Sequence, residues 1–157
     1  MKQTAIYKTC KNIASLGPIG FLPASGTWGS LVALPVAWWL LGTPYLTFLI
    51  VLSFIVGVFT IHPLIEGEKQ KDPSFVIIDE FMGQLLVFSL FSQDFKEPIL
   101  FIFGFLFFRL FDILKPWPAS FFDRKVHSSF GVMMDDFGAG LYAIFCLAFL
   151  EIISYYL

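Results

Sequence analysis

Long apolar tracts occupy most of this chain of 157 residues, and they constrain its fold more than any other feature. There are four tracts, at residues 28–61, 75–91, 98–114 and 132–157. A turn signal at Gly42-Thr43-Pro44 divides the first of them into segments 28–41 and 45–61. Hydrophobic residues make up 57% of the chain and charged residues 14%, whereas a soluble domain averages roughly 45–50% and 25%. This apolar excess predicts a lipid environment.

Inside a bilayer the backbone has to satisfy its own hydrogen bonds, so each tract is expected to form an α-helix. The predicted fold class is therefore all-α: one polytopic membrane domain over residues 1–157, with about four to five membrane-embedded helices. Segment 28–41 reaches roughly 21 Å at about 1.5 Å per residue, which is short of a ~30 Å hydrocarbon core. It is expected either to span with a tilt or to form half of a re-entrant hairpin.

The positive charges are distributed unevenly along this pattern of tracts. If the N-terminus is cytoplasmic, Lys96 alone falls outside and Arg109 lies within a span. All the other cations then lie on the cytoplasmic side: Lys2, Lys8, Lys11, Lys69, Lys71, Lys115, Arg124 and Lys125. This is the bias that the positive-inside rule requires. The polar segments between the tracts that carry these cations are therefore predicted to face the cytoplasm. No basic block suggests nucleic acid as a partner.

Acidic residues cluster on the same predicted face. They are Asp79, Glu80, Asp112, Asp123, Asp135 and Asp136, with the first pair about one turn inside a helix that begins near Phe75 and the last pair opening the final helix. Carboxylates near hydrocarbon are costly and persist where they pair with cations or line a watery cavity. So many acids would repel one another unless a cation lies among them, and an all-oxygen ligand set suits Mg²⁺ or Mn²⁺. The alternative is that they are solvated helix starts or partners of nearby Lys and Arg.

Cationic and small polar residues accompany the acids. Arg109 lies three residues before Asp112 on one helical face, where it either binds a phosphate or forms a structural ion pair. Lys115 and Arg124 lie close in sequence to Asp112 and Asp123 and can donate to a phosphomonoester. Thr27 and Ser30, in Gly26-Thr27-Trp28-Gly29-Ser30, offer hydroxyls beside backbone N–H groups at a helix start, although such a segment also serves simple capping.

Several phosphatase chemistries lack their motifs in this sequence. There is no Cys-x5-Arg thiolate loop, no Asp-x-Asp-x-Thr nucleophile motif and no histidine-nucleophile spacing around His127. The free cysteines Cys10 and Cys146 lack the spacing of a zinc site. Metal-assisted hydrolysis, in which a cation neutralises phosphate charge and activates water, is the chemistry that remains.

The motifs resemble the phosphatidylglycerophosphatase A family. The similarity extends over about residues 15 to 145, in the family's order, and rests on these blocks: Gly26-Thr27-Trp28-Gly29-Ser30, Asp79-Glu80-Phe81-Met82-Gly83, Phe108-Arg109-Leu110-Phe111-Asp112, Lys115-Pro116-Trp117-Pro118, Phe122-Asp123-Arg124 and Gly131 with Asp135-Asp136. The resemblance implies an enzyme of the bacterial cytoplasmic membrane that uses Mg²⁺. Its substrate would be phosphatidylglycerophosphate, hydrolysed at the terminal phosphomonoester to phosphatidylglycerol.

Within that resemblance the acids and cations receive hypothetical roles. Asp79, Glu80, Asp135 and Asp136 are expected to hold Mg²⁺, and Asp112 or Asp123 to position or deprotonate the attacking water. Phosphate binding is assigned to Lys115, Arg124 and Arg109, with Thr27 and Ser30 beside them. The competing class is a non-enzymatic transporter or channel subunit with an intramembrane acidic ion site, which predicts charges at all depths of the membrane.

Overall fold

The computed structural model describes residues 5–66 and 73–156, without the side chains of residues 123, 124 and 154–156. Within that part every regular element is helical, as the apolar tracts predict. Two short 3-10 helices, η1 (Ile19–Phe21) and η2 (Gln93–Phe95), accompany seven α-helices: α1 (Ala5–Ala14), α2 (Ser25–Leu40), α3 (Pro44–Ile65), α4 (Ile78–Val87), α5 (Pro98–Leu114), α6 (Ala119–Lys125) and α7 (Ser129–Tyr156).

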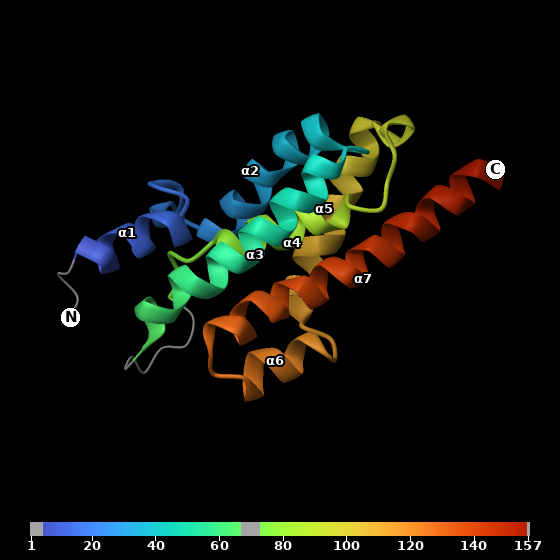
Figure 1. The fold of residues 1–157 in the computed structure, drawn as a ribbon. Coiled ribbons are helices and arrows are strands. Elements are labelled where there is room, and N and C mark those ends of the chain that lie inside the picture. Colours follow the sequence, from blue (N-terminus) through green and yellow to red (C-terminus); the bar gives the residue numbers. More distant parts are fainter. Residues whose placement is uncertain (1–4, 67–72, 157) are drawn as a thin grey trace.

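Helix α4 lies at the centre of the molecule. It contacts α2, α3, α5 and α7, and eight of its ten residues are buried. Helix α7 runs past it along most of the length of the molecule, with its C-terminal end projecting beyond the other helices (Figure 1). A Cβ added at Gly140 of α7 would lie 2.9 Å from the carbonyl oxygen of Gly83 in α4. The two helices therefore pack backbone against backbone, which small residues permit.

Helices α4 and α7 begin at other residues than the sequence predicts. Helix α4 begins at Ile78, because the N–H of Ile77 donates to the carbonyl of Ala14 at 2.9 Å and ties the preceding segment to the end of α1. The prediction of a helix from near Phe75 was wrong, and Asp79 and Glu80 lie in the first helical turn. Helix α7 begins at Ser129, so Asp135 and Asp136 lie about two turns inside it and do not open it.

The direction of the helices defines two ends of the molecule, one with short connectors and one with the acids and cations. A Cβ added at Gly42, between α2 and α3, would lie 2.8 Å from the backbone nitrogen of Gln93 in η2, so these two connectors lie together. Helix α2 runs toward this end from Gly26, and α5 runs away from it toward Arg109 and Asp112. The described residues singled out for chemistry therefore gather at the end opposite the short connectors.

Two of the described helices are long and apolar enough to cross a membrane: α3 over Pro44–Ile65 and α7 over residues Ser129–Ile153. Helices α2 and α5, with 16 and 17 residues, reach only about 24 and 26 Å. Large apolar side chains cover much of the exterior, among them Phe59 on α3 and Phe145 on α7, each 73% exposed. An exterior of this kind fits a membrane-associated protein, because water does not favour it.

Candidate active site

Three carboxylates converge where α4 meets α7. One oxygen from each of Asp79, Glu80 and Asp136 lies within 4.8 Å of the other two. Asp79 and Asp136 are almost fully buried, with 4% of each residue exposed. The Oδ1 atom of Asp79 and the Oδ2 atom of Asp136 accept no hydrogen bond from any described residue. Buried oxygens of like charge that lack protein donors fit a bound cation, so these three residues can hold a metal ion.

Close helix packing explains why the acids of α4 and α7 meet. A Cβ added at Gly83 would lie 2.9 Å from the carbonyl oxygen of Asp136 and 2.6 Å from the ring of Phe108. Gly83 follows Asp79 by four residues, so the two lie on one face of α4. This face therefore rests directly on the α7 backbone at Asp136, which directs both carboxylates to the same point.

The first turn of α2 forms another wall of the site. A Cβ added at Gly26 would lie 2.1 Å from Oε1 of Glu80 and 3.3 Å from Nη1 of Arg109. Glycine is needed here because any side chain would displace the Glu80 carboxylate. Ser30, one turn later and fully buried, donates through Oγ to the carbonyl of Gly26 at 3.0 Å. The small residues of this segment thus admit the carboxylate, while Thr27 lies half-buried in the same turn.

Arg109 connects this wall to α5. Its Nη1 atom lies 2.7 Å from Oδ2 of Asp112, one turn away on α5, and makes a long 3.5 Å contact with Oγ of Ser30. Both charged side chains keep some exposure, 19% for Arg109 and 13% for Asp112. The guanidinium is therefore held beside the carboxylate cluster, and its remaining N–H donors can reach an oxyanion there.

A second cation lies beside the cluster at the end of α5. Lys115 caps this helix in the left-handed conformation, with φ 46°, and its Nζ donates to Oδ2 of Asp135. The segment that follows is held to α7, because the hydroxyl of Tyr142 donates to the carbonyl of Trp117 at 2.6 Å. Of the four residues predicted to bind metal, Asp135 thus pairs with Lys115, while Asp79, Glu80 and Asp136 form the cluster.

Comparison with known proteins connects this arrangement to an enzyme family. Residues 12–151 match the family model described as phosphatidylglycerophosphatase A. The chain is 33% identical over 147 residues to phosphatidylglycerophosphatase A of Haemophilus influenzae, covering 85% of this chain and 89% of that protein. It is 32% identical over 128 residues to the Escherichia coli protein of the same name, covering 80% of this chain and 73% of that protein.

The chain belongs to the phosphatidylglycerophosphatase A family. It is therefore a phosphatase, and the transporter alternative has no support. A relative from Bacteroides thetaiotaomicron, 32% identical over 140 residues with 82% of this chain and 85% of that protein covered, carries a provisional name as a phosphatidylinositol-3-phosphatase. No solved structure matches the chain.

Two residues of the family-like blocks, Asp123 and Arg124, lie in α6, but their side chains are outside the described part of the structure. Their predicted roles in positioning water and binding phosphate stay predictions. Helix α6 itself packs against α7, the helix that carries Asp135 and Asp136.

The described structure also contains a buried polar residue that the sequence reasoning missed. Gln84 has no exposed surface, and neither its Oε1 nor its Nε2 atom has a hydrogen-bond partner among the described residues. It follows Glu80 by four residues, so it lies one turn deeper on the same side of α4. The sequence marks Gln84 only as a polar residue within an apolar tract. A polar residue that faces solvent near a loop would give the same pattern.

Proposed function

We propose that this protein hydrolyses the terminal phosphomonoester of phosphatidylglycerophosphate, releasing inorganic phosphate and leaving phosphatidylglycerol. The observation that supports this most directly is the convergence of the Asp79, Glu80 and Asp136 carboxylates, with cations beside them, in a member of this phosphatase family. In the reaction the phosphorus–oxygen bond to the lipid glycerol breaks, water supplies the new oxygen on phosphorus, and the departing alkoxide gains a proton.

The residues of the cluster would hold Mg²⁺. Their donors are all carboxylate oxygens, which suit a small hard cation. When bound, Mg²⁺ would neutralise charge on the phosphate and lower the pKa of a water molecule. Asp135, which the sequence reasoning placed among the metal ligands, would instead hold the Lys115 ammonium through the ion pair between them.

The remaining polar groups would bind and orient the phosphate and the attacking water. Arg109, oriented by Asp112 and Ser30, would donate to two phosphate oxygens, as planar guanidinium groups do. Lys115 would neutralise a further oxygen, and Arg124 in α6 and Thr27 in the first turn of α2 would supply further donors. Asp112 or Asp123 would accept a proton from the attacking water.

The topology completes the proposal. We propose a single domain over residues 1–157 in the bacterial cytoplasmic membrane, crossing it several times, with the carboxylate cluster at the cytoplasmic face. The positive-inside bias supports this orientation, because Lys8, Lys11 and Lys115 belong to the cluster end and Lys96 follows η2 at the connector end. A substrate made in the cytoplasmic leaflet would then reach the site directly.

The decisive experiment measures phosphate release by the purified protein in mixed micelles. With phosphatidylglycerophosphate and Mg²⁺ we expect turnover, and EDTA should abolish it until Mg²⁺ is restored. Phosphatidylinositol 3-phosphate is the comparison substrate, because of the Bacteroides relative. Release from neither lipid would overturn the enzymatic proposal, and preference for the inositol lipid would overturn the proposed substrate.

A further inference from the structure

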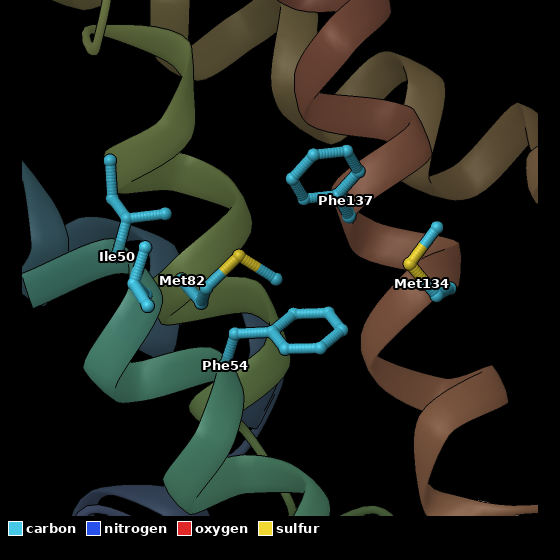
Figure 2. Close-up of a pocket in the computed structure, with 6 residues that line it drawn as sticks. Ile50, Phe54, Met82, Met134 and Phe137 are labelled. Atoms are coloured by element: carbon cyan, nitrogen blue, oxygen red, sulfur yellow. The ribbon is translucent and has the colours of Figure 1, made fainter. Parts of the chain in front are cut away.

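An apolar groove lies next to the carboxylate cluster and takes no part in the chemistry described above. Its volume is about 410 Å³, within the range of roughly 300–1,000 Å³ typical of small-molecule sites. Figure 2 shows side chains from α3, α4 and α7 around it. The lining residues are all apolar: Ile50, Val51, Phe54, Met82, Met134 and Phe137.

Two of the helices that line the groove, α4 and α7, also carry the cluster. Met82 follows Asp79 by three residues on α4, so their side chains are neighbours on one helical face. Phe137 directly follows Asp136 on α7. A molecule whose phosphate lies at the carboxylate cluster therefore has the groove about one helical turn away, toward the connector end.

The groove is also accessible from the exterior. Val51, which lines it, is 51% exposed, and the helices on its two sides, α3 and α7, are those long enough to cross a membrane. Methionines supply two of the lining side chains, and their flexible thioethers adapt to chains of varied shape. A cavity of this composition offers nothing to a headgroup and favours hydrocarbon, because apolar cavities exclude water.

We infer that this groove binds one acyl chain of the phospholipid substrate and thereby holds the headgroup phosphate at the carboxylate cluster. The inference rests on the proposed function, because a phospholipid phosphatase has to accommodate hydrocarbon beside its phosphate site. Binding energy from the acyl chain would then position the reacting group, as remote substrate parts do in other enzymes.

The test fills the groove from its exposed edge. Val51→Trp adds a large ring at the opening, and Leu52→Trp is the matched control, since Leu52 is 41% exposed on the same helix but does not line the groove. Phosphate release is measured with dioleoyl and with dihexanoyl phosphatidylglycerophosphate. We expect Val51→Trp to lower kcat/KM for the dioleoyl lipid about tenfold or more, with the dihexanoyl lipid and the control within about twofold of wild type.

The two substrates separate the possible failures. If wild-type protein releases phosphate from neither lipid, the proposed function fails. If wild type is active and Val51→Trp hydrolyses both lipids equally well, the groove does not bind the acyl chain. Equal loss with both lipids would mean that the tryptophan disturbs the catalytic site, and this result would also overturn the inference.

A second measurement is independent of turnover. A non-hydrolysable phosphonate analogue of dioleoyl phosphatidylglycerophosphate with a diazirine in one acyl chain is photolysed with the wild-type protein in Mg²⁺, and the modified peptides are sequenced by mass spectrometry. We expect labels on the peptides of Met82 and Met134, reduced by excess of the same analogue without the diazirine but not by phosphatidylcholine. If phosphatidylcholine competes equally well, the groove binds bulk lipid. If crosslinks between two protein copies appear in place of lipid labels, the groove binds a second copy. Either result overturns the inference.

Discussion

At the scale of single residues, the cluster contrasts two adjacent aspartates with different partners. The carboxylate of Asp136 approaches Asp79 and Glu80, and its Oδ2 atom accepts no hydrogen bond from the described residues. The carboxylate of Asp135 accepts a bond from Lys115. Adjacent helical positions differ by about 100°, so neighbours in sequence can serve separate groups. The two aspartates are therefore expected to respond differently to the same substitution.

Replacing Asp136 by Asn should remove a metal ligand. We expect phosphate release to fall about a hundredfold or more, and the thermal stabilisation that Mg²⁺ gives the wild-type protein to disappear. In EDTA the variant should melt no lower than wild type, because one of three mutually repelling carboxylates is gone. Calorimetry with and without Mg²⁺ measures this. The control is Asp94→Asn, which changes an exposed residue in η2. Unchanged Mg²⁺ stabilisation of the Asp136 variant would refute the role of Asp136 as a ligand.

Replacing Asp135 by Asn should instead release Lys115. We expect activity to fall about tenfold, mainly through a higher KM, because the ammonium is no longer held toward the phosphate. The Mg²⁺ concentration for half-maximal stabilisation should stay within about threefold of the wild-type value, since the cluster keeps its three ligands. A large rise in that concentration would return Asp135 to the metal site, as the sequence reasoning expected.

At the scale of helices, the site depends on close approach. Glycines allow close approach at three points around the acids: Gly26 in α2 meets Glu80, Gly83 in α4 meets Asp136, and Gly140 in α7 meets Gly83. Repeated glycines in the sequence indicate close packing, but they do not specify which helix lies against which. The pairing of α4 with α7 follows from the whole fold, because both helices have to bury one face against the other.

Adding a methyl group at Gly26 tests this packing. Alanine favours a helix over glycine by about 0.5–1 kcal/mol, so Gly26→Ala in α2 should not unfold the helix. Its Cβ would nevertheless lie 2.1 Å from Oε1 of Glu80, and we expect at least about a tenfold loss of phosphate release as that carboxylate moves. Gly138→Ala is the matched control, because its Cβ would meet Ala119 at 3.2 Å, away from the acids. Similar activity of both variants would contradict the assigned contact.

At the scale of the whole molecule, the helices separate a chemical end from a connector end. Asp94 in η2 and His127, which follows α6, are both exposed and lie beyond opposite ends of α5. In a background with Cys10→Ser and Cys146→Ser, Asp94→Cys should react with a membrane-impermeant maleimide in intact cells. His127→Cys should react only after the membrane is permeabilised. Labelling of His127→Cys in intact cells would reverse the proposed orientation, and phosphate release by each variant verifies that it is folded.

Helix content followed from the sequence with little ambiguity. The apolar tracts at 45–61 and 98–114 became α3 and α5 with nearly the predicted limits, because a long apolar segment satisfies its backbone best as a helix. The tract at 75–91 did not, since the hydrogen bond from Ile77 to Ala14 holds its first residues outside the helix and α4 begins only at Ile78. That contact joins residues far apart in the chain, and no local pattern reveals it.

The sequence alone determined that this chain is helical, strongly apolar and a carrier of acids and cations in the order seen in phosphatidylglycerophosphatase A. Only the tertiary structure decided which acids meet: Asp79, Glu80 and Asp136 form the cluster, and Asp135 pairs with Lys115. The physical reason is rotational. Composition and spacing specify that a helix forms, but the direction of each side chain depends on how that helix is turned against its neighbours, and backbone contacts between distant segments set that rotation.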